Sequence, residues 1–361
     1  MPVTDAFESN QPLQLLKNLP PLDWEEMTRP EDYVAWDNEL IAAANVALTL
    51  GKPLLLTGEP GVGKSEFARW LAHELELGDR EKFVVKSTTE ATDLFYTYDT
   101  LGRFHDAQIH STPQFSSSST KTAPDVGTVV DKRQLQYLNY QALGIAILNS
   151  RGRATVLKTQ CVSPEKSLAI AETPRRTVVL IDEIDKAPRD VPNDILDEID
   201  KMAFSVKEIG SVSLKSDKTL RPIVVITSNS ERDLPEPFLR RCIYYHIPFP
   251  KTDKDLQKIL LSRLRKRMAE SSPLLSDTQA LFSYLRNGTI PFQRKPGLAE
   301  LLDWLYDLTR DSENLHKRLS ELDRQAYMSA KSTLLKHAED QKLTTEQAWR
   351  DWLQKAGLVD G

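Results

Sequence analysis

The chain has 361 residues, of which 40% are hydrophobic and 27% charged, so it has the composition of a globular protein and room for two domains. Its formal net charge of −5 argues against a protein built mainly to coat nucleic acid. No stretch approaches ~18 consecutive apolar residues, and the N-terminus has no apolar run, so we expect neither a membrane span nor a signal peptide. The distant cysteines, Cys161 and Cys242, are expected to be reduced thiols of a cytoplasmic protein.

The first predicted elements alternate between helix and strand. Residues 1–30 are rich in proline and acidic residues and are expected to form an N-terminal arm. A helix is predicted over 33–52, where Gly51 ends it, and an apolar strand then precedes a second helix that begins near Lys64. Further buried strands are predicted within 82–87, 177–183, 221–230 and 242–250.

The remaining elements complete a two-domain arrangement. An insertion is expected over about 88–150, with a Ser/Thr-rich loop at 111–127 and a helical pattern at 137–150. A β-hairpin is predicted at 204–214, around Gly210. Strands that are continuous apolar runs and alternate with helices imply an α/β domain over 31–250 with a parallel sheet covered on both faces. Residues 251–361 are predicted to form a smaller, helical domain.

A glycine-rich turn separates the first strand from the second helix. It reads GEPGVGKS and fits the P-loop pattern G-x-x-x-x-G-K-[ST] without a mismatch. The glycines let backbone N–H groups point at an anion, and the helix N-terminus adds positive potential. Lys64 would reach the β- and γ-phosphates, and the Ser65 hydroxyl would bind Mg²⁺. The residues expected at the nucleotide are Gly58, Glu59, Pro60, Gly61, Val62, Gly63, Lys64, Ser65 and Glu66.

Two acidic residues end a later apolar strand, in the sequence TVVLIDEIDKAP. Ligands of open α/β sheets bind at the carboxyl ends of the strands, where Asp182 and Glu183 are predicted to lie. Asp182 would help to hold Mg²⁺, and Glu183 could act as the general base that polarises the attacking water.

Three segments in this order are similar to the AAA+ ATPases: GEPGVGKS, VVLIDEIDKAP and VVITSNSERDLPEPFLRRCIYYHIPFP. The segments ATDLFYTYDTLGRFHDAQ and KPGLAELLDWLYDL, with the predicted hairpin, resemble the MoxR branch of that superfamily. The resemblance covers roughly residues 31–308. It implies a five-stranded parallel sheet flanked by helices, a helical lid domain, ATP and Mg²⁺ as ligands, and a homo-oligomeric ring, usually a hexamer.

The resemblance also implies roles for residues outside the glycine-rich motif and the acidic motif. Asn229 matches the sensor residue beside the γ-phosphate. Arg241 matches the arginine finger inserted into a neighbouring subunit, and the adjacent Arg240 could share or take that role. The family often has an arginine at the start of the third lid helix, where this chain reads FQRKPGLAE. Either Arg294 or Lys295 would substitute there, or the contact is missing.

The function implied by the resemblance is the remodelling or activation of a partner protein, driven by ATP hydrolysis. The client expected is a protein with a von Willebrand factor A domain. Two alternatives remain open: a nucleic-acid-stimulated AAA+ motor of a restriction type, and an assembly switch gated by ATP with little turnover. The aromatic residues Tyr96, Tyr98 and Phe104 could grip a client from a pore loop or pack the core of the insertion.

Overall fold

The computed structural model describes residues 29–110, 132–229, 232–264, 267–322 and 324–359. Most of the expected N-terminal arm and the loop expected at 111–127 lie outside them. The described residues form two compact units. We call residues 38–57 and 67–246 the strand unit, and residues 29–37, 58–66 and 247–359 the helical unit. None of the helices described in either unit has both the length and the hydrophobicity needed to cross a membrane.

The strand unit alternates helices and strands, as predicted. Its α-helices are α2 (Asn38–Leu50), α3 (Lys64–Glu74, which begins in the helical unit), α4 (Thr100–His110), α5 (Ala142–Asn149), α6 (Arg153–Lys158), α7 (Val191–Asp194), α8 (Leu196–Lys201) and α9 (Glu236–Arg241). Its strands are β1 (Leu54–Thr57), β2 (Glu81–Val84), β3 (Tyr96–Tyr98), β4 (Leu138–Tyr140), β5 (Val178–Asp182), β6 (Ala203–Val206), β7 (Val212–Lys215), β8 (Ile223–Thr227) and β9 (Ile243–His246). Its 3-10 helices are η3 (Ala91–Leu94), η4 (Lys132–Tyr137), η5 (Lys166–Ala169), η6 (Ile184–Lys186) and η7 (Lys207–Ile209).

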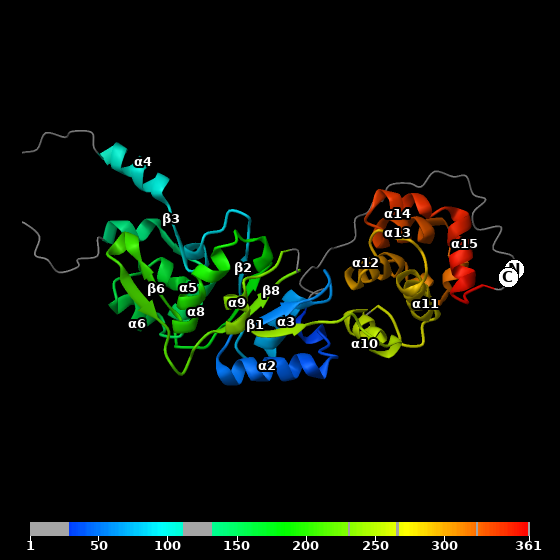
Figure 1. Ribbon diagram of the computed structural model, residues 1–361, viewed down its shortest axis with the longest axis horizontal. Helices are drawn as coiled ribbons and strands as arrows, with labels where there is room; N and C mark the ends of the chain where they lie inside the picture. The colour runs from blue at the N-terminus through cyan, green and yellow to red at the C-terminus, as the bar shows by residue number, and fades with distance from the viewer. Residues whose placement is uncertain (1–28, 111–131, 230–231, 265–266, 323, 360–361) are drawn as a thin grey trace, which may run out of the picture. The chain divides into compact units, whose positions relative to one another are not determined.

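Five strands form one parallel sheet in the order β2-β5-β8-β1-β9, which confirms the predicted fold class (Figure 1). The central strands β1 and β5 are buried along their whole length, since helices cover both of their faces. Helix α2 packs against β1 and β9, and α5 packs against β2 and β5. The prediction of buried strands at 82–87 and 242–250 was wrong in one respect: β2 and β9 are edge strands whose side chains alternate, with Val84 44% and Tyr244 54% exposed.

Two predicted helices begin later than their sequence pattern indicates. Helix α2 starts at Asn38 rather than 33, because Tyr33 has an extended backbone after a short 3-10 turn, η2 (Pro30–Asp32). The helical pattern expected at 137–150 first forms strand β4, which pairs antiparallel with β3, and only then α5. Gly144 of α5 lies against the Phe95 carbonyl, which a Cβ atom would meet at 2.0 Å. The spacing of apolar residues in the sequence cannot predict this tertiary contact.

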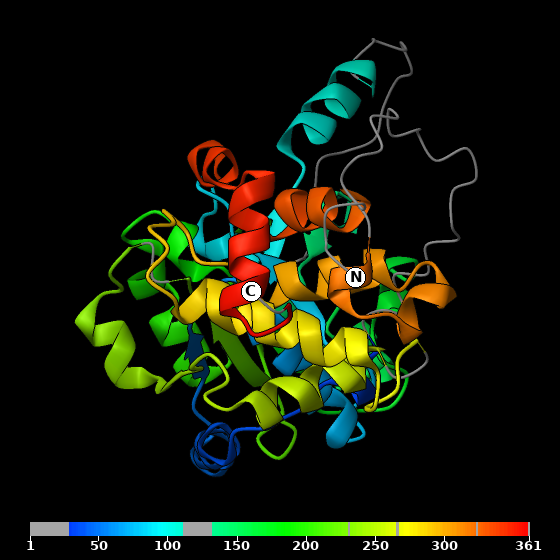
Figure 2. The same cartoon turned by 90° about the vertical axis from the view of Figure 1, so that its right-hand side faces the viewer.

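The insertion projects from the rest of the strand unit through α4, as two perpendicular views show (Figures 1 and 2). On α4, Leu101 is 82% and Phe104 63% exposed. Tyr96, by contrast, is buried and stacks on Phe204 of the hairpin, so core packing accounts for it. Tyr98 makes an edge-to-face contact with Tyr137. The predicted hairpin is confirmed as the antiparallel pair β6–β7.

The helical unit has its own apolar core. Its helices are α10 (Asp253–Leu264), α11 (Pro273–Asn287), α12 (Leu298–Leu308), α13 (Arg324–Leu334), α14 (Ala338–Leu343) and α15 (Glu346–Lys355), with 3-10 turns η8 (Ser312–His316) and η9 (Leu319–Glu321). Trp304 of α12 is fully buried and meets Trp349 of α15 edge to face, at 6.2 Å between ring centroids. The residues beyond 311, which carry no readable motif, therefore close the same core.

Candidate nucleotide-binding site

The carboxyl ends of three central strands meet at one edge of the sheet. Asp182 ends β5, Thr227 ends β8 and Thr57 ends β1. The parallel register pairs Leu56 with Thr227, so these ends lie level with each other. The glycine-rich turn follows Thr57 directly in the chain. This is the edge at which parallel sheets bind ligands.

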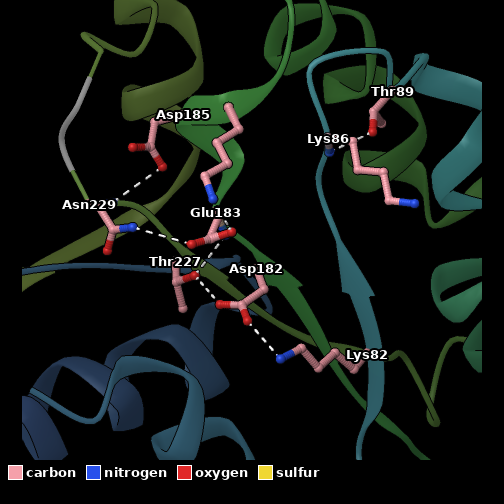
Figure 3. A network of polar contacts seen from close by, with 9 residues as sticks. Lys82, Lys86, Thr89, Asp182, Glu183, Asp185, Thr227 and Asn229 are labelled. Atoms are coloured by element: carbon pink, nitrogen blue, oxygen red, sulfur yellow. Dashed lines mark hydrogen bonds and ion pairs between the residues drawn. The ribbon is translucent and has the colours of Figure 1, made fainter. Parts of the chain in front are cut away.

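Asp182 is almost fully buried and is held from two sides (Figure 3). The Thr227 hydroxyl donates to Asp182 Oδ1 at 2.6 Å, and Lys82 Nζ lies 2.8 Å from Oδ2. Lys82 comes from the edge strand β2, which pairs with β5. These partners fix the orientation of the carboxylate, as a metal-binding carboxylate requires.

Glu183 follows in a left-handed backbone conformation, with φ of +63°. A residue with a side chain is rarely stable there without local support. The support comes from Thr227, whose hydroxyl accepts the Glu183 N–H at 3.0 Å. The turn aims the Glu183 carboxylate toward Lys186 Nζ, at 2.6 Å, and toward Asn229 Nδ2, at 3.5 Å (Figure 3).

Asn229 lies just beyond β8, and a hydrogen bond from its backbone N–H fixes its position. Its N–H donates to Asp185 Oδ1 at 3.2 Å, and Asp185 is itself buried. The structure thus brings Asp182, Glu183 and Asn229 together within the strand unit, through contacts that run across the ends of β5 and β8.

The P-loop lies in the helical unit, and its lysine is buried. Lys64 Nζ donates to the carbonyl oxygens of Gly58, at 2.7 Å, and Glu59, at 3.0 Å. Gly61 has φ of +81°, and a Cβ atom there would lie 2.8 Å from the Ala299 side chain. Both the backbone conformation and the close approach of α12 therefore require glycine at this position.

Other residues predicted to bind the nucleotide lie in the same turn and at the start of α3. Val62 is buried, and Ser65 and Glu66 form the first turn of α3 after Lys64. Tyr33, which the sequence pattern assigned to a helix, packs its ring against Gly63. Burial raises the pKa of Tyr33 above its ordinary value, the nearby Arg263 lowers it, and the carboxylate of Glu66 adds to the rise. Tyr33 is therefore a neutral, apolar support of the loop.

The two candidate finger arginines lie on α9 and differ in their contacts. Arg241 Nε lies 3.1 Å from Asp200 Oδ2, and both side chains are 47% exposed. Arg240 is 77% exposed and pairs with Glu236 one turn earlier, at 3.5 Å. Exposed pairs of this kind contribute little to stability, so either guanidinium is available to reach a neighbouring molecule.

The sequence predicts that Arg294 or Lys295 replaces the arginine that the family often has at the start of the third lid helix. Lys295 is exposed, and Arg294 pairs with Glu300 at 3.4 Å. Among the described residues, Arg286 of α11 contacts the P-loop: its Nη2 donates to both carboxylate oxygens of Glu59, at 2.8 and 2.7 Å.

The donor set suits a metal ion that is held jointly with a nucleotide. Among the described residues, no group of three or more His, Cys, Asp or Glu side chains could hold a metal alone. Mg²⁺ in nucleotide sites takes one or two protein oxygens, waters and phosphate oxygens. The Ser65 hydroxyl of the helical unit and the Asp182 carboxylate of the strand unit are each an oxygen donor of the kind that Mg²⁺ takes, and Lys64 is a cation of the kind that binds phosphates.

Sequence reasoning missed several residues that position the predicted ones, among them Lys82, Asp185, Lys186, Thr227 and Arg286. A polar residue at the last position of an apolar strand is a readable signal for Thr227, and Lys186 lies in the same acidic motif as Glu183. Lys82 and Arg286 carry no such signal, because their roles depend on strand pairing and on helix packing, respectively.

Comparison with known proteins matches much of the chain to a family. A family model described as AAA domain (dynein-related subfamily) matches residues 53–242, which is more than half of the chain. The matched segment includes the P-loop, Asp182, Glu183, Asn229 and Arg241. A search of curated proteins finds no match.

Proposed function

The chain belongs to the AAA domain family, in its dynein-related subfamily, and on this premise we propose that it is a Mg²⁺-dependent ATPase of the MoxR type. Members of this family generally hydrolyse ATP and assemble into rings. We propose further that the ring, a hexamer, uses hydrolysis to remodel or activate a client protein, with a von Willebrand factor A domain protein as the expected client.

One observation carries the proposal of hydrolysis. The Glu183 carboxylate and the Asn229 amide come from neighbouring strands and meet at 3.5 Å, beside the buried Asp182. A general base must be held at a fixed position, and the left-handed turn of Glu183 with its bond to Thr227 does this. A protein that only bound nucleotide would have no need of a carboxylate in this conformation.

The roles of the residues follow from their chemistry. Bound Mg²⁺ and ATP would supply the electrophilic phosphoryl group, with Ser65 and Asp182 holding the metal and Lys64 binding the β- and γ-phosphates. Glu183 accepts the proton of the attacking water, and the Asn229 amide orients that water. Arg241, or Arg240, stabilises the charge of the transition state in the site of a neighbouring subunit.

Turnover is tested by phosphate release from the purified protein with ATP and Mg²⁺. Lys64→Ala should abolish ATP binding, whereas Glu183→Gln should bind ATP and lose turnover, because an amide cannot accept the proton. ATP affinity of Lys64→Ala within a factor of ~3 of the unaltered protein would refute the P-loop assignment. Turnover that rises with DNA and falls with salt would favour the nucleic-acid motor, and ATP-driven assembly with negligible turnover would favour the switch.

The ring and its client are tested together. Light scattering with and without ATP and Mg²⁺ should show nucleotide-dependent assembly. A constant monomer at tens of micromolar with full activity would refute the ring. Affinity capture from native cells with Glu183→Gln, which should retain ATP, identifies the client, and Lys64→Ala is the matched control because it should not bind ATP. A protein captured equally by both variants is not a client of the ATP-bound state.

A further inference from the structure

A buried arginine of the helical unit is fixed in contact with the P-loop. Arg286 is 8% exposed and lies in the last turn of α11. Its Nη2 donates to both carboxylate oxygens of Glu59, its Nη1 donates to the Pro296 carbonyl at 3.0 Å, and its guanidinium lies 3.7 Å from the centroid of the Phe249 ring. A planar group that donates from two nitrogens to two different acceptors while it stacks on an aromatic ring is specific to arginine.

Glu59 connects this arginine to the phosphate-binding lysine. Its side chain receives Arg286, and its backbone carbonyl accepts a hydrogen bond from Lys64 Nζ at 3.0 Å. Glu59 is also the second residue of the glycine-rich turn. A carboxylate in that position adds a negative charge beside the cradle that must accept phosphates, which by itself weakens their binding.

We propose that Arg286 is a positioning residue that acts through Glu59: it neutralises the carboxylate and ties the P-loop to α11. The loop then presents Lys64 and its backbone N–H groups to the phosphates without a competing negative charge. This inference rests on the proposed binding of ATP. It assigns Arg286 no contact with the phosphates themselves.

The loss of Arg286 should therefore matter only while Glu59 is charged. Arg286→Gln keeps part of the packing on Phe249 and a hydrogen-bond donor for the Pro296 carbonyl, but leaves Glu59 uncompensated. We expect the affinity for ATP to fall about tenfold, the size typical of one unbalanced charge near a bound anion. In the double variant with Glu59→Gln the uncompensated carboxylate is gone, so the affinity should recover to that of Glu59→Gln alone.

Three measurements separate this role from a structural one. Calorimetric titration with ATP gives the affinities. The loss in Arg286→Gln should shrink at high salt, because screening weakens a charge effect but not a packing defect. Thermal unfolding reports the stability of each variant. Arg318→Met is a matched control, since Arg318 also makes an ion pair with α11, to Asp277 at 3.2 Å, away from the P-loop, and should leave ATP affinity unchanged.

The outcomes decide between the alternatives. If the double variant binds ATP as weakly as Arg286→Gln, or if Arg286→Gln shows no loss, the proposal is wrong. If Arg286→Gln does not fold, Arg286→Lys keeps the positive charge without the second donor at the Pro296 carbonyl and without the planar stacking on Phe249. It should lose no more than about threefold in affinity. A tenfold loss in that variant that Glu59→Gln does not relieve also overturns the proposal. Failure of the unaltered protein to bind ATP would instead refute the proposed function.

Discussion

Thr227 carries a hydroxyl group that makes hydrogen bonds with both acidic residues of the site, Asp182 and Glu183. Its Oγ1 donates to Asp182 at 2.6 Å and accepts the Glu183 N–H at 3.0 Å, and the residue is 1% exposed. Thr227→Val replaces the hydroxyl with a methyl group of nearly the same size. It therefore removes both hydrogen bonds without leaving a cavity.

The expected cost follows from what is left behind. A hydrogen bond to a charged group contributes about 1.5–3 kcal/mol, and a buried N–H without a partner costs about 1–3 kcal/mol. We expect Thr227→Val to lower the free energy of unfolding by about 2–4 kcal/mol. Glu183 would also lose the bond that supports its left-handed backbone, and a misplaced catalytic group typically lowers turnover by about 10- to 100-fold.

The assay compares denaturant unfolding, ATP affinity and turnover for three variants. Thr227→Ser keeps the hydroxyl and should retain most of the turnover. Thr177→Val is the matched control: Thr177 is fully buried just before β5, at the end of that strand away from Asp182, and accepts only the Asn149 amide at 3.3 Å among its described side-chain contacts. It should lose stability but keep its rate. Turnover of folded Thr227→Val within twofold of the unaltered protein would show that Glu183 does not depend on this bond.

Three other predictions concern different parts of the chain. Glu183→Gln and Arg241→Ala should each be nearly inactive, yet a 1:1 mixture should regain about a quarter of the sites, because each site needs Glu183 from one subunit and Arg241 from the next; mixed rings without activity would point to Arg240 instead. Burial raises the pKa of Cys242 to about 12, so a thiol reagent at pH 8 should label it only after unfolding, and rapid labelling of the native protein would contradict this burial. Phe104→Ala should leave the free energy of unfolding within about 0.5 kcal/mol, because the ring is 63% exposed, but should reduce client capture; undiminished capture would exclude Phe104 from the contact.

Much of the strand unit could be predicted because its signals are local. The central strands are continuous apolar runs, since a parallel sheet buries both faces, and their order of appearance with the helices indicated the fold class. The glycine-rich turn and the acidic strand end were likewise visible, because each motif is short and contiguous. The position of β2 in the sheet could not be predicted. It is an edge strand, and the sequence alone did not distinguish its alternating side chains from those of a buried strand.

The sequence by itself predicted which residues would bind phosphate, coordinate Mg²⁺ and activate water, because Lys64, Asp182 and Glu183 lie in contiguous motifs whose chemistry can be read directly. Only the tertiary structure decided which side chains position the residues of these motifs. Thr227 reaches Asp182 across 45 positions of the chain, and Arg286 reaches Glu59 across 227. Such partners are chosen by strand pairing and helix packing, which depend on the whole core rather than on neighbouring residues. The side chains that support a site therefore leave no local pattern in the sequence.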